Sequence, residues 1–379
     1  MDIRKFRENT PGRIITIEGG EHAYIPNALP PRWKFPEKLW PLLLDARENL
    51  ALLEGVGRTL PDSSLLLRPI QRREAIQSSR LEGTYATPRE LLLFEIDQKQ
   101  PTGEDDPAND WREVFNYQQS LQYGTTTELP LSLRLIRELH RILCTGVRGR
   151  EHAPGEFRRI QVAIGPSFRF VPPPPQFLDE CLDSFEKYLH APNEFDPLVD
   201  CFIAHYQFEA IHPFRDGNGR VGRVLLAMMI QQRCKLTKPW LYLSEFFEKN
   251  RNDYRQFLFD VNAKVAWTDW VEFCLRGTSE QAKATIQRCE NLRIIKDDYM
   301  QRLGATGGRV RLNKIVDDLF SSPIIELAQL PERLEVTYPT AKSDVERLVD
   351  VGILAELPDT PVRTFYAPEI YRVAYGDID

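Results

Sequence analysis

The chain has 379 residues and a formal net charge of −6, with 42% hydrophobic and 27% charged residues. At about 150 residues per domain, this length predicts two or three domains with cores of their own. The composition is that of a globular protein and excludes wholesale disorder. The negative charge disfavours a protein that binds nucleic acid through bulk electrostatics.

Six cysteines are scattered along the chain, and no two of them have the C-x-x-C spacing of a zinc knuckle or a thioredoxin-like site. We therefore expect free buried thiols in a reducing compartment. The N-terminus lacks the apolar core of a secretory signal. The longest apolar run covers residues 224–230, well short of the ~20 residues that a membrane-spanning helix needs. These observations predict a cytoplasmic protein without a membrane segment.

The first 35 residues are rich in proline, glycine and arginine, which predicts an extended N-terminal lead-in. Apolar residues at helical spacing then predict helices over residues 37–58, 63–81, 111–122, 132–143, 176–189, 197–211, 217–232, 243–263 and 267–303. The polar stretch 98–109 predicts a loop and a subdomain boundary. Residues 155–171 alternate in polarity around a Gly-Pro turn, which predicts a β-hairpin.

The last part of the chain has a different texture. Residues 305–308 (Ala-Thr-Gly-Gly) predict a hinge. The short helical patterns and strands that follow have the order of a winged helix: helices over 312–320, 324–330 and 340–351, and strands over 354–357 and 363–367. The expected fold is mainly α, with a lead-in (1–35), an N-terminal helical region (36–110), a helical core (111–303) and a winged-helix-like domain (304–379).

The most informative stretch is the segment His-Pro-Phe-Arg-Asp-Gly-Asn-Gly-Arg-Val-Gly-Arg at residues 212–223. A helix is expected to end before Pro213, because proline cannot continue it. Gly217, Asn218 and Gly219 form a loop that lets backbone N–H groups come close to a ligand. The helix that follows points its free N–H groups back into this loop, which is an anion-binding geometry.

The charged residues of the segment indicate a polyphosphate. Arg220 and Arg223 share one side of the first helical turn, where a cation is unfavourable by roughly 0.3–1 kcal/mol unless an anion is bound. Asp216 adds the single carboxylate that commonly holds Mg²⁺ beside phosphate oxygens. His212 is a candidate general base near neutral pH. Each feature alone is more often structural, but their combination indicates a nucleotide-dependent transferase.

The segment resembles the signature of the Fic (filamentation induced by cAMP) family, H-P-F-x-[DE]-G-N-G-R-x-x-R, at every fixed position. Residues 204–211 and the hairpin at 155–175 are also similar to that family. The resemblance covers about residues 36–303, with a winged-helix tail that is common in the family. It implies a Fic helical bundle in which the hairpin is a flap that aligns a target protein by strand addition.

The resemblance implies a protein adenylyltransferase that transfers AMP from ATP to a Ser, Thr or Tyr hydroxyl of a target protein. His212 would take the hydroxyl proton, and Asp216 would hold Mg²⁺ between the α- and β-phosphates. The backbone of residues 217–219 and the Asn218 side chain would stabilise charge on the α-phosphate. A kinase-like branch of the family has lysine at the position of Gly219, so the glycine favours adenylyl transfer.

Further residues complete the implied nucleotide site. Arg220 and Arg223 would bind the β- and γ-phosphates. Phe214 would point inward and pack under the loop, while Tyr254 and Asn262 are candidates to enclose adenine. Transfer of another nucleotide, such as UMP or GMP, is an alternative for the same core.

A glutamate earlier in the chain suggests a brake. By itself, Glu82 would be read as a solvated acid at a helix end, where it opposes the helix dipole. The segment from Ser78 to Gly83, however, is similar to the family's inhibitory motif [ST]-x-x-x-E-[GN]. By that resemblance Glu82 would pair with Arg223 and occupy the γ-phosphate position. In some relatives the same glutamate serves AMP removal, and that alternative stays open.

Residues 300–379 hold nine Lys and Arg against thirteen Asp and Glu. This balance favours a C-terminal domain that docks a protein or forms a homodimer over one that reads DNA. A nucleotide-sensing transcription regulator is the alternative from another functional class, although a pure sensor has no need of the base His212. Self-modification of an exposed hydroxyl is also open.

Overall fold

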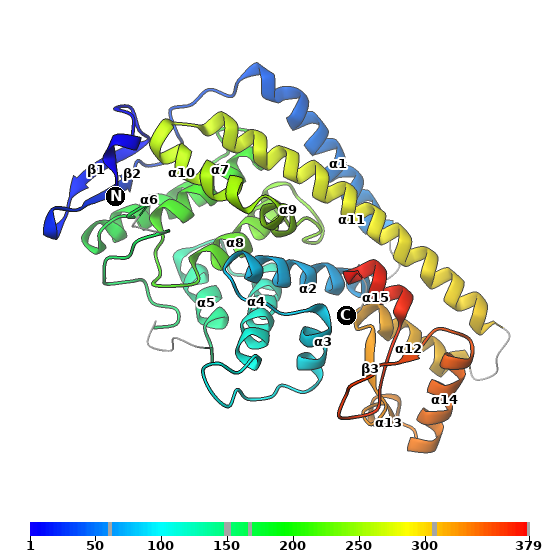
Figure 1. Ribbon diagram of the computed structural model, residues 1–379. Coiled ribbons are helices and arrows are strands. Elements are labelled where there is room, and N and C mark those ends of the chain that lie inside the picture. The colour runs from blue at the N-terminus through cyan, green and yellow to red at the C-terminus, as the bar shows by residue number, and fades with distance from the viewer. Residues whose placement is uncertain (60–62, 148–152, 166–168, 305–308, 377–379) are drawn as a thin grey trace.

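The computed structural model describes residues 1–59, 63–147, 153–165, 169–304 and 309–376, and most of them lie in helices (Figure 1). The helices of the main body are α1 (Trp40–Thr59), α2 (Ser63–Leu81), α3 (Pro88–Ile96), α4 (Ala108–Thr126), α5 (Leu133–Leu143), α6 (Leu178–His190), α7 (Pro197–Ile211), α8 (Asn218–Arg233), α9 (Ser244–Lys249), α10 (Arg251–Lys264) and α11 (Trp267–Leu303). Within the described ranges, none of the helices combines the length and apolar character that a membrane crossing needs.

Helices α7 and α8 form the centre of the helical body (Figure 1). Nearly every residue of α7 is buried, because the helix is apolar on most of its circumference. Helix α11 runs beside α1 along the outside of the body. The mainly helical fold that the sequence predicts is therefore confirmed, with the signature loop between the two central helices.

The N-terminal segment contains a β-hairpin where we expected an extended lead-in. Strand β1 (Gly12–Thr16) pairs antiparallel with β2 (His22–Pro26). Gly19 and Gly20 have positive φ angles of 82° and 78°, which glycine adopts readily, and they allow the chain to reverse between the strands. The backbone N–H of Tyr24 donates to the carbonyl of Val171 at 2.8 Å. The hairpin thus lies against the end of the expected flap.

The flap itself is less regular than predicted. In the described part of residues 155–171, pairing is limited to the isolated bridge between Ile164 and Phe170. Residues 166–168, which include the Pro of the expected turn, lie outside the described residues. The helix predicted over 243–263 is divided at Asn250 into α9 and α10. Helix α3 was not predicted at all.

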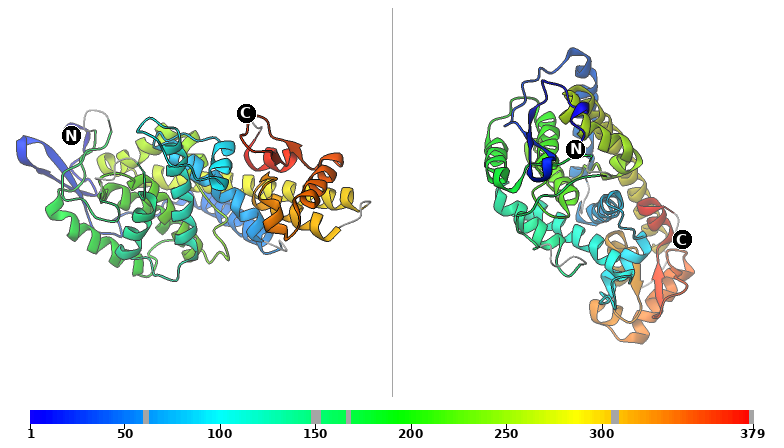
Figure 2. Two further views of the ribbon diagram at one scale, coloured as in Figure 1. Left: turned by 90° about the horizontal axis from the view of Figure 1, so that it is seen from below. Right: turned by 60° about the vertical axis from the view of Figure 1, so that its left-hand side comes forward.

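The C-terminal domain follows α11 and lies at the opposite end of the molecule from the N-terminal hairpin (Figure 2). Its elements are α12 (Arg309–Ser321), β3 (Ile324–Glu326), α13 (Leu330–Leu334), α14 (Tyr338–Asp350), β4 (Ala355–Glu356), β5 (Thr364–Tyr366) and α15 (Pro368–Tyr375), and the sheet order is β3-β5-β4. Three helices, α12, α13 and α14, precede the antiparallel pair of β4 and β5. The helix predicted over 324–330 is wrong, because Ile324 and Ile325 are buried in strand β3. The expected hinge at 305–308 lies outside the described residues.

Candidate active site

The loop between α7 and α8 begins at His212, whose backbone is left-handed with φ of 51°. Its N–H still donates to the carbonyl of Phe208 at 2.9 Å, so His212 closes the last turn of α7. Pro213 then prevents the helix from continuing. Gly217 has φ of 75° and precedes the first residue of α8. The sequence therefore forms the predicted helix–loop–helix, with the N-terminus of α8 opening at the loop.

Two buried side chains give the loop its shape. The Asn218 amide accepts from the N–H of Phe214 at 2.7 Å and donates to the Phe214 carbonyl at 2.9 Å. Phe214 is fully buried and stacks on His140, with ring centroids 3.8 Å apart. The inward packing predicted for Phe214 is confirmed. Both side chains are therefore used within the loop.

His140 joins the flap to the loop. The N–H of Gly155 donates to His140 Nδ1 at 2.8 Å. Because Nδ1 accepts, the neutral ring carries its proton on Nε2, which lies 3.1 Å from the carbonyl of Asp216 and donates to it. The beginning of the flap and the middle of the loop are thus held by one imidazole ring.

Arg223 carries the ion pair expected from the inhibitory motif. Its guanidinium donates to Glu82 Oε1 at 2.8 Å, to the Ser78 hydroxyl at 2.7 Å and to the Ser78 carbonyl at 2.9 Å. Arg223 is buried, whereas the Glu82 side chain is 36% exposed. Burial raises the pKa of Glu82, but the charge and hydrogen bond of Arg223, together with the charges of Arg220 and Arg255, outweigh it and hold the pKa below its usual value. The carboxylate is therefore ionised at neutral pH.

The C-terminal end of α2, where Glu82 lies, is surrounded by cations. Arg251 of α10 donates to the carbonyl of Arg80 at 2.7 Å, and Arg255 of the same helix donates to the carbonyl of Leu81 at 2.7 Å. The Arg80 carbonyl also accepts from the N–H of Gly83 at 3.1 Å. Cations are favourable at this end of a helix dipole. They offset the cost of placing an acid at the end of α2.

Arg220 has different partners from Arg223. It donates to Glu113 of α4 at 3.0 Å and to Asp216 at 3.3 Å. Glu113 also accepts from the hydroxyl of Thr84 at 2.9 Å. The Asp216 side chain is 58% exposed. This carboxylate is therefore accessible, and the described residues contain no cluster of three or more acidic, His or Cys side chains that could hold a metal ion.

A cavity of about 670 Å³ opens beside His212, a volume in the usual range of small-molecule sites. Its wall includes both partners of the Glu82–Arg223 pair, and Gly219. Of the other residues predicted to contact the nucleotide, Tyr254 and Asn262 line the cavity. Its wall does not include Phe214, Asp216, Gly217, Asn218 or Arg220 among the described residues.

Hydrogen bonds hold in place the side chains of Tyr254 and Asn262, the candidates to enclose adenine. The Tyr254 hydroxyl lies 2.9 Å from His205 Nε2, and His205 Nδ1 donates to the carbonyl of Gly222 at 3.1 Å. Burial lowers the pKa of His205 to about 3, so the ring is neutral and accepts the Tyr254 proton. Asn262 accepts from the Tyr206 hydroxyl at 2.7 Å. These bonds therefore fix the Tyr254 and Asn262 side chains in the cavity wall.

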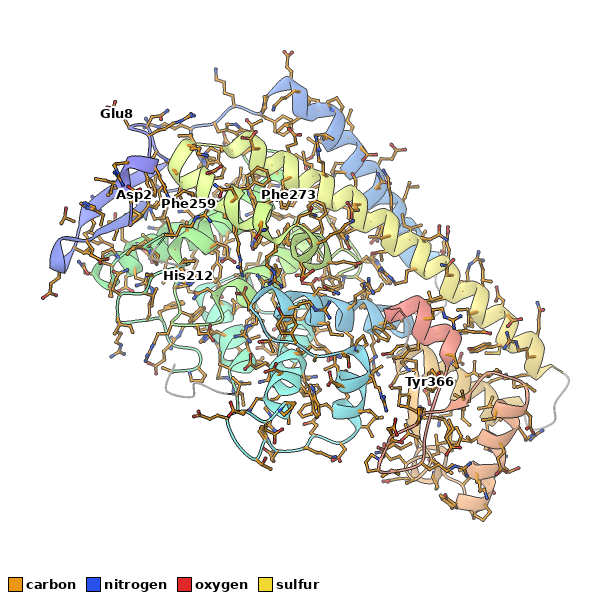
Figure 3. The ribbon with its side chains drawn as sticks, viewed as in Figure 1. Asp2, Glu8, His212, Phe259, Phe273 and Tyr366 are labelled. Atoms are coloured by element: carbon orange, nitrogen blue, oxygen red, sulfur yellow. The ribbon has the colours of Figure 1, made fainter. Side chains whose placement is uncertain are left out.

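Aromatic residues close the far side of the cavity, next to the N-terminal hairpin. Phe170 and Phe259 line it, and both pack with Tyr24 of β2 in one apolar cluster. His212 and Phe259 both lie on the same side of the helical body as the N-terminal hairpin (Figure 3). The cavity wall thus combines the Glu82–Arg223 pair with aromatic side chains, and the guanidinium of Arg169, another wall residue, lies 4.7 Å over the Phe259 ring.

Burial changes the proton affinity of two groups on the cavity wall. Burial, followed by the charge of Arg158, lowers the pKa of His212 to about 4, so its imidazole is neutral near pH 7. Burial also raises the pKa of Glu209 to about 8. His212 is therefore in the form that accepts a proton, and Glu209 carries one.

Comparison with known proteins identifies the family. Residues 40–126 match the family model described as Fic/DOC family N-terminal, and residues 130–230 match the model described as Fic/DOC family. The chain belongs to the Fic/DOC family. The protein adenylyltransferase Fic of Drosophila grimshawi is 38% identical over 107 residues, or 28% of this chain and 21% of that protein. The Aedes aegypti protein of the same name is 38% identical over 104 residues, or 27% of this chain and 20% of that protein.

The chain therefore matches only about a fifth of the length of these Fic relatives. Solved structures extend the likeness of the fold. A Fic family protein from Desulfovibrio desulfuricans superposes with a TM-score of 0.58 at 20% identity, over 89% of this chain and 98% of that one. A Fic-1 fragment from C. elegans superposes with a TM-score of 0.52 at 21% identity, over 68% of this chain and 74% of that one.

The sequence prediction missed several residues around the Fic loop: Glu113, His140, Arg158, His205 and Glu209. His205 and Glu209 lie in the stretch just before the signature, and Arg158 lies in the expected flap. Their presence in segments similar to the family was a usable signal. Glu113 and His140 lie in ordinary helical patterns, and only the fold brings them to the loop.

Proposed function

We propose that the protein transfers AMP from ATP to a Ser, Thr or Tyr hydroxyl of a target protein, and that Glu82 restrains this activity. The observation that carries the proposal is the ion pair of Glu82 with the buried Arg223, in the wall of a nucleotide-sized cavity that also contains His212. A buried guanidinium at a helix N-terminus favours an anion. Glu82 supplies that anion until a triphosphate replaces it.

The reaction follows from the residues around the loop. The target oxygen attacks the α-phosphorus, the bond from that phosphorus to the pyrophosphate oxygen breaks, and the hydroxyl proton passes to the neutral imidazole of His212. The N–H groups at the start of α8 and the Arg223 guanidinium stabilise charge on the phosphates. Pyrophosphate leaves with the electrons of the broken bond.

Asp216 would hold Mg²⁺, because its exposed carboxylate is accessible to a phosphate-bound cation. When bound, Mg²⁺ neutralises charge on the phosphate oxygens. Asp216 also accepts from Arg220 at 3.3 Å, which restrains the carboxylate. The chain's own contribution is thus to fix one ligand in place.

Restraint by Glu82 depends on a close approach to the loop. A Cβ atom placed on Gly219 would lie 2.2 Å from Glu82 Oε1 and 2.9 Å from Arg223 Nη1. The absence of a side chain at Gly219 therefore lets the carboxylate reach Arg223 over the phosphate loop. A triphosphate that binds while Glu82 holds Arg223 would have its terminal phosphates displaced, and its α-phosphate would be badly aligned for attack.

The target would dock on the flap at residues 155–175, with its hydroxyl directed at His212. The bridge between Ile164 and Phe170 and the contact of Val171 with Tyr24 support a flap of extended backbone beside the cavity. Extended backbone with free hydrogen-bonding groups can add a target segment as a strand.

The test is incubation of the purified protein and a cell extract with Mg²⁺ and α-labelled ATP. Glu82→Gly and the isosteric Glu82→Gln are expected to label protein roughly 100-fold faster than wild type, because the phosphates regain Arg223. The double variant Glu82→Gly/His212→Ala is expected to label nothing. His190→Ala, at an exposed histidine, is the matched control. Labelled UTP and GTP in parallel reactions establish which nucleotide is used.

If neither Glu82 variant labels protein faster than wild type, Glu82 does not restrain the transfer. Undiminished labelling by the double variant with His212→Ala would show that His212 is not the general base.

A second activity has one observation in its favour. The partly exposed edge of Glu82 beside His212 could position a water molecule for AMP removal. Chasing labelled target with wild-type protein and with Glu82→Gln measures that reaction directly.

A further inference from the structure

Arg158 is a buried cation at the base of the flap, with a relative exposure of 4%. Its guanidinium bonds only to backbone carbonyls in the described part of the chain, although a buried arginine is normally paired with a carboxylate. The partners are the carbonyls of His212 at 2.8 Å, Ile160 at 3.1 Å, Pro173 at 2.6 Å and, more weakly, Ile211 at 3.4 Å. All three guanidinium nitrogens are therefore used.

These partners belong to three separate segments. Ile160 follows Arg158 at the start of the flap, and Pro173 lies at its end. Ile211 and His212 are the end of α7 and the start of the signature loop. The backbone N–H of Arg158 also donates to the carbonyl of Pro213 at 2.9 Å. The guanidinium thus joins both ends of the flap to the carbonyls of Ile211 and His212, and the backbone N–H of Arg158 adds a bond to Pro213 on the other side of His212.

We propose that Arg158 is a positioning residue of the transfer reaction, whose guanidinium holds the left-handed backbone of His212 and sets the flap in register with it. A target strand aligned on the flap is then aligned with the base as well. The inference rests on the proposed function and deepens it, because it names what connects target docking to the reacting group. Arg158 is outside the cavity wall, so it acts through His212 and not on the nucleotide.

The charge of Arg158 gives a readout that a purely structural role would not change. Burial and the positive charge of Arg158 lower the pKa of His212 to about 4, while the negative charges of Glu82 and Asp216 act in the opposite direction. Removal of the Arg158 charge should therefore move the pKa of His212 upward, toward its ordinary value near 6.5. The acid limb of the pH–rate profile would move to higher pH with it.

The experiment uses the full chain with Glu82→Gly, in which transfer is expected to be measurable. Arg158→Met keeps an unbranched apolar stem and removes the guanidinium, while Arg158→Lys keeps the charge without the fork. We expect Arg158→Met to lower kcat about 100-fold at an unchanged KM for ATP, because misplacement by about 1 Å costs that much. Arg158→Lys should return the acid limb of the pH–rate profile to its position in the Glu82→Gly protein. Its kcat should stay well below that of the Glu82→Gly protein. The exposed neighbour Arg159→Gln is the matched control.

Unchanged kcat in Arg158→Met would overturn the inference, and so would a loss confined to the KM for ATP. An imidazole NMR titration of His212 in the same variants does not depend on transfer. An unmoved His212 pKa in Arg158→Met would also overturn it, even if Glu82→Gly proves inactive and the proposed function fails. If a melting curve shows that Arg158→Met does not fold, the test uses Arg158→Lys instead. An undiminished kcat in Arg158→Lys would show that the guanidinium group is not required.

Discussion

Glu209 is a buried carboxyl group in the wall of the cavity, close to two charged groups of the site. Burial raises its pKa to about 8, the charge of Arg223 acts against this, and the charge of Glu82 adds to it. Its Oε1 atom is buried without a hydrogen-bond partner among the described residues. A neutral carboxyl group avoids the cost of a second buried negative charge beside Glu82. Of the two glutamates in the described cavity wall, Glu82 is therefore ionised and Glu209 neutral at pH 7.

This difference predicts a pH-dependent effect of Glu209→Gln on stability. Folded wild type keeps the Glu209 proton up to pH about 8, whereas the unfolded chain loses it near its ordinary pKa of 4.5. The folded state binds more protons between these values, so this group makes wild type less stable as pH rises. Glutamine does not titrate. The Tm of the variant minus that of wild type should increase between about pH 5 and pH 8 and then level off.

Thermal melts of both proteins across this range check the prediction. Glu18→Gln, at an exposed glutamate of the N-terminal segment, is the control and should show a flat difference. A flat difference for Glu209→Gln as well would mean that Glu209 is ionised in the folded protein.

At the same scale, the site was predictable where it is contiguous. The segment 212–223 carries its own turn residues, helix start and charges, so local rules predict a phosphate loop from it. The ion pair of Arg220 with Glu113 could not be predicted in this way, because Glu113 is 107 residues away and lies in an ordinary amphipathic helix. The same holds for Arg158, whose bonds to the loop cross 54 residues. No local pattern encodes such pairs, and only the packed fold reveals them.

At the scale of elements, helices with a clear apolar periodicity were predicted well. Helices α2, α7 and α11 have the expected bounds within two residues or fewer. The wrong predictions concern short elements, such as those next to glycine and proline residues. The N-terminal strands flank a Gly-Gly turn in a segment that proline had marked as irregular. In the C-terminal domain, the two buried isoleucines of β3 were too few to separate a strand from a helix.

The missed hairpin has a predicted role at this scale, because it supports the aromatic end of the cavity. Tyr24 is fully buried, and its ring lies 5.6 Å from that of Phe170. Tyr24→Ala should cost about 3–5 kcal/mol of stability, as truncation of a buried aromatic does. It should also weaken nucleotide binding about tenfold, since Phe170 loses its backing. Titration with a fluorescent ATP analogue measures this, with Thr16→Ala on the exposed edge of β1 as control.

Nucleotide affinity equal to that of Thr16→Ala, in a Tyr24→Ala protein that is still folded, would show that the hairpin does not shape the cavity. The melting temperature separates the two effects, because a general loss of stability without a change in Kd has no bearing on the cavity.

At the scale of the whole molecule, α2 extends from α8 to the helices α12 and α15 of the C-terminal domain (Figure 1). One end of the helix presents Ser78 and Glu82 to Arg223. At the middle of the helix, Arg72 donates to the carbonyl of Ser321 at the end of α12 and pairs with Glu95 of α3 at 2.6 Å. The next residue, Arg73, donates to the carbonyl of Ala374 in α15 at 3.4 Å. A partner that moves the C-terminal domain would thus act on the helix that carries Glu82.

This arrangement predicts that loosening the C-terminal contact of α2 weakens the restraint. Arg72→Met keeps the buried stem and removes the guanidinium, so basal AMP transfer should rise several-fold through a less firmly held Glu82. In the Glu82→Gly background the same substitution should add nothing, because both changes act through one carboxylate and cannot be additive. Arg363→Ala, in an exposed pair with Glu356 of the same domain, is the control and should leave transfer unchanged. An equal increase from Arg72→Met in both backgrounds would show that the C-terminal domain acts by another route. No increase in either background would show that α2 holds Glu82 in place without the Arg72 contact to the C-terminal domain.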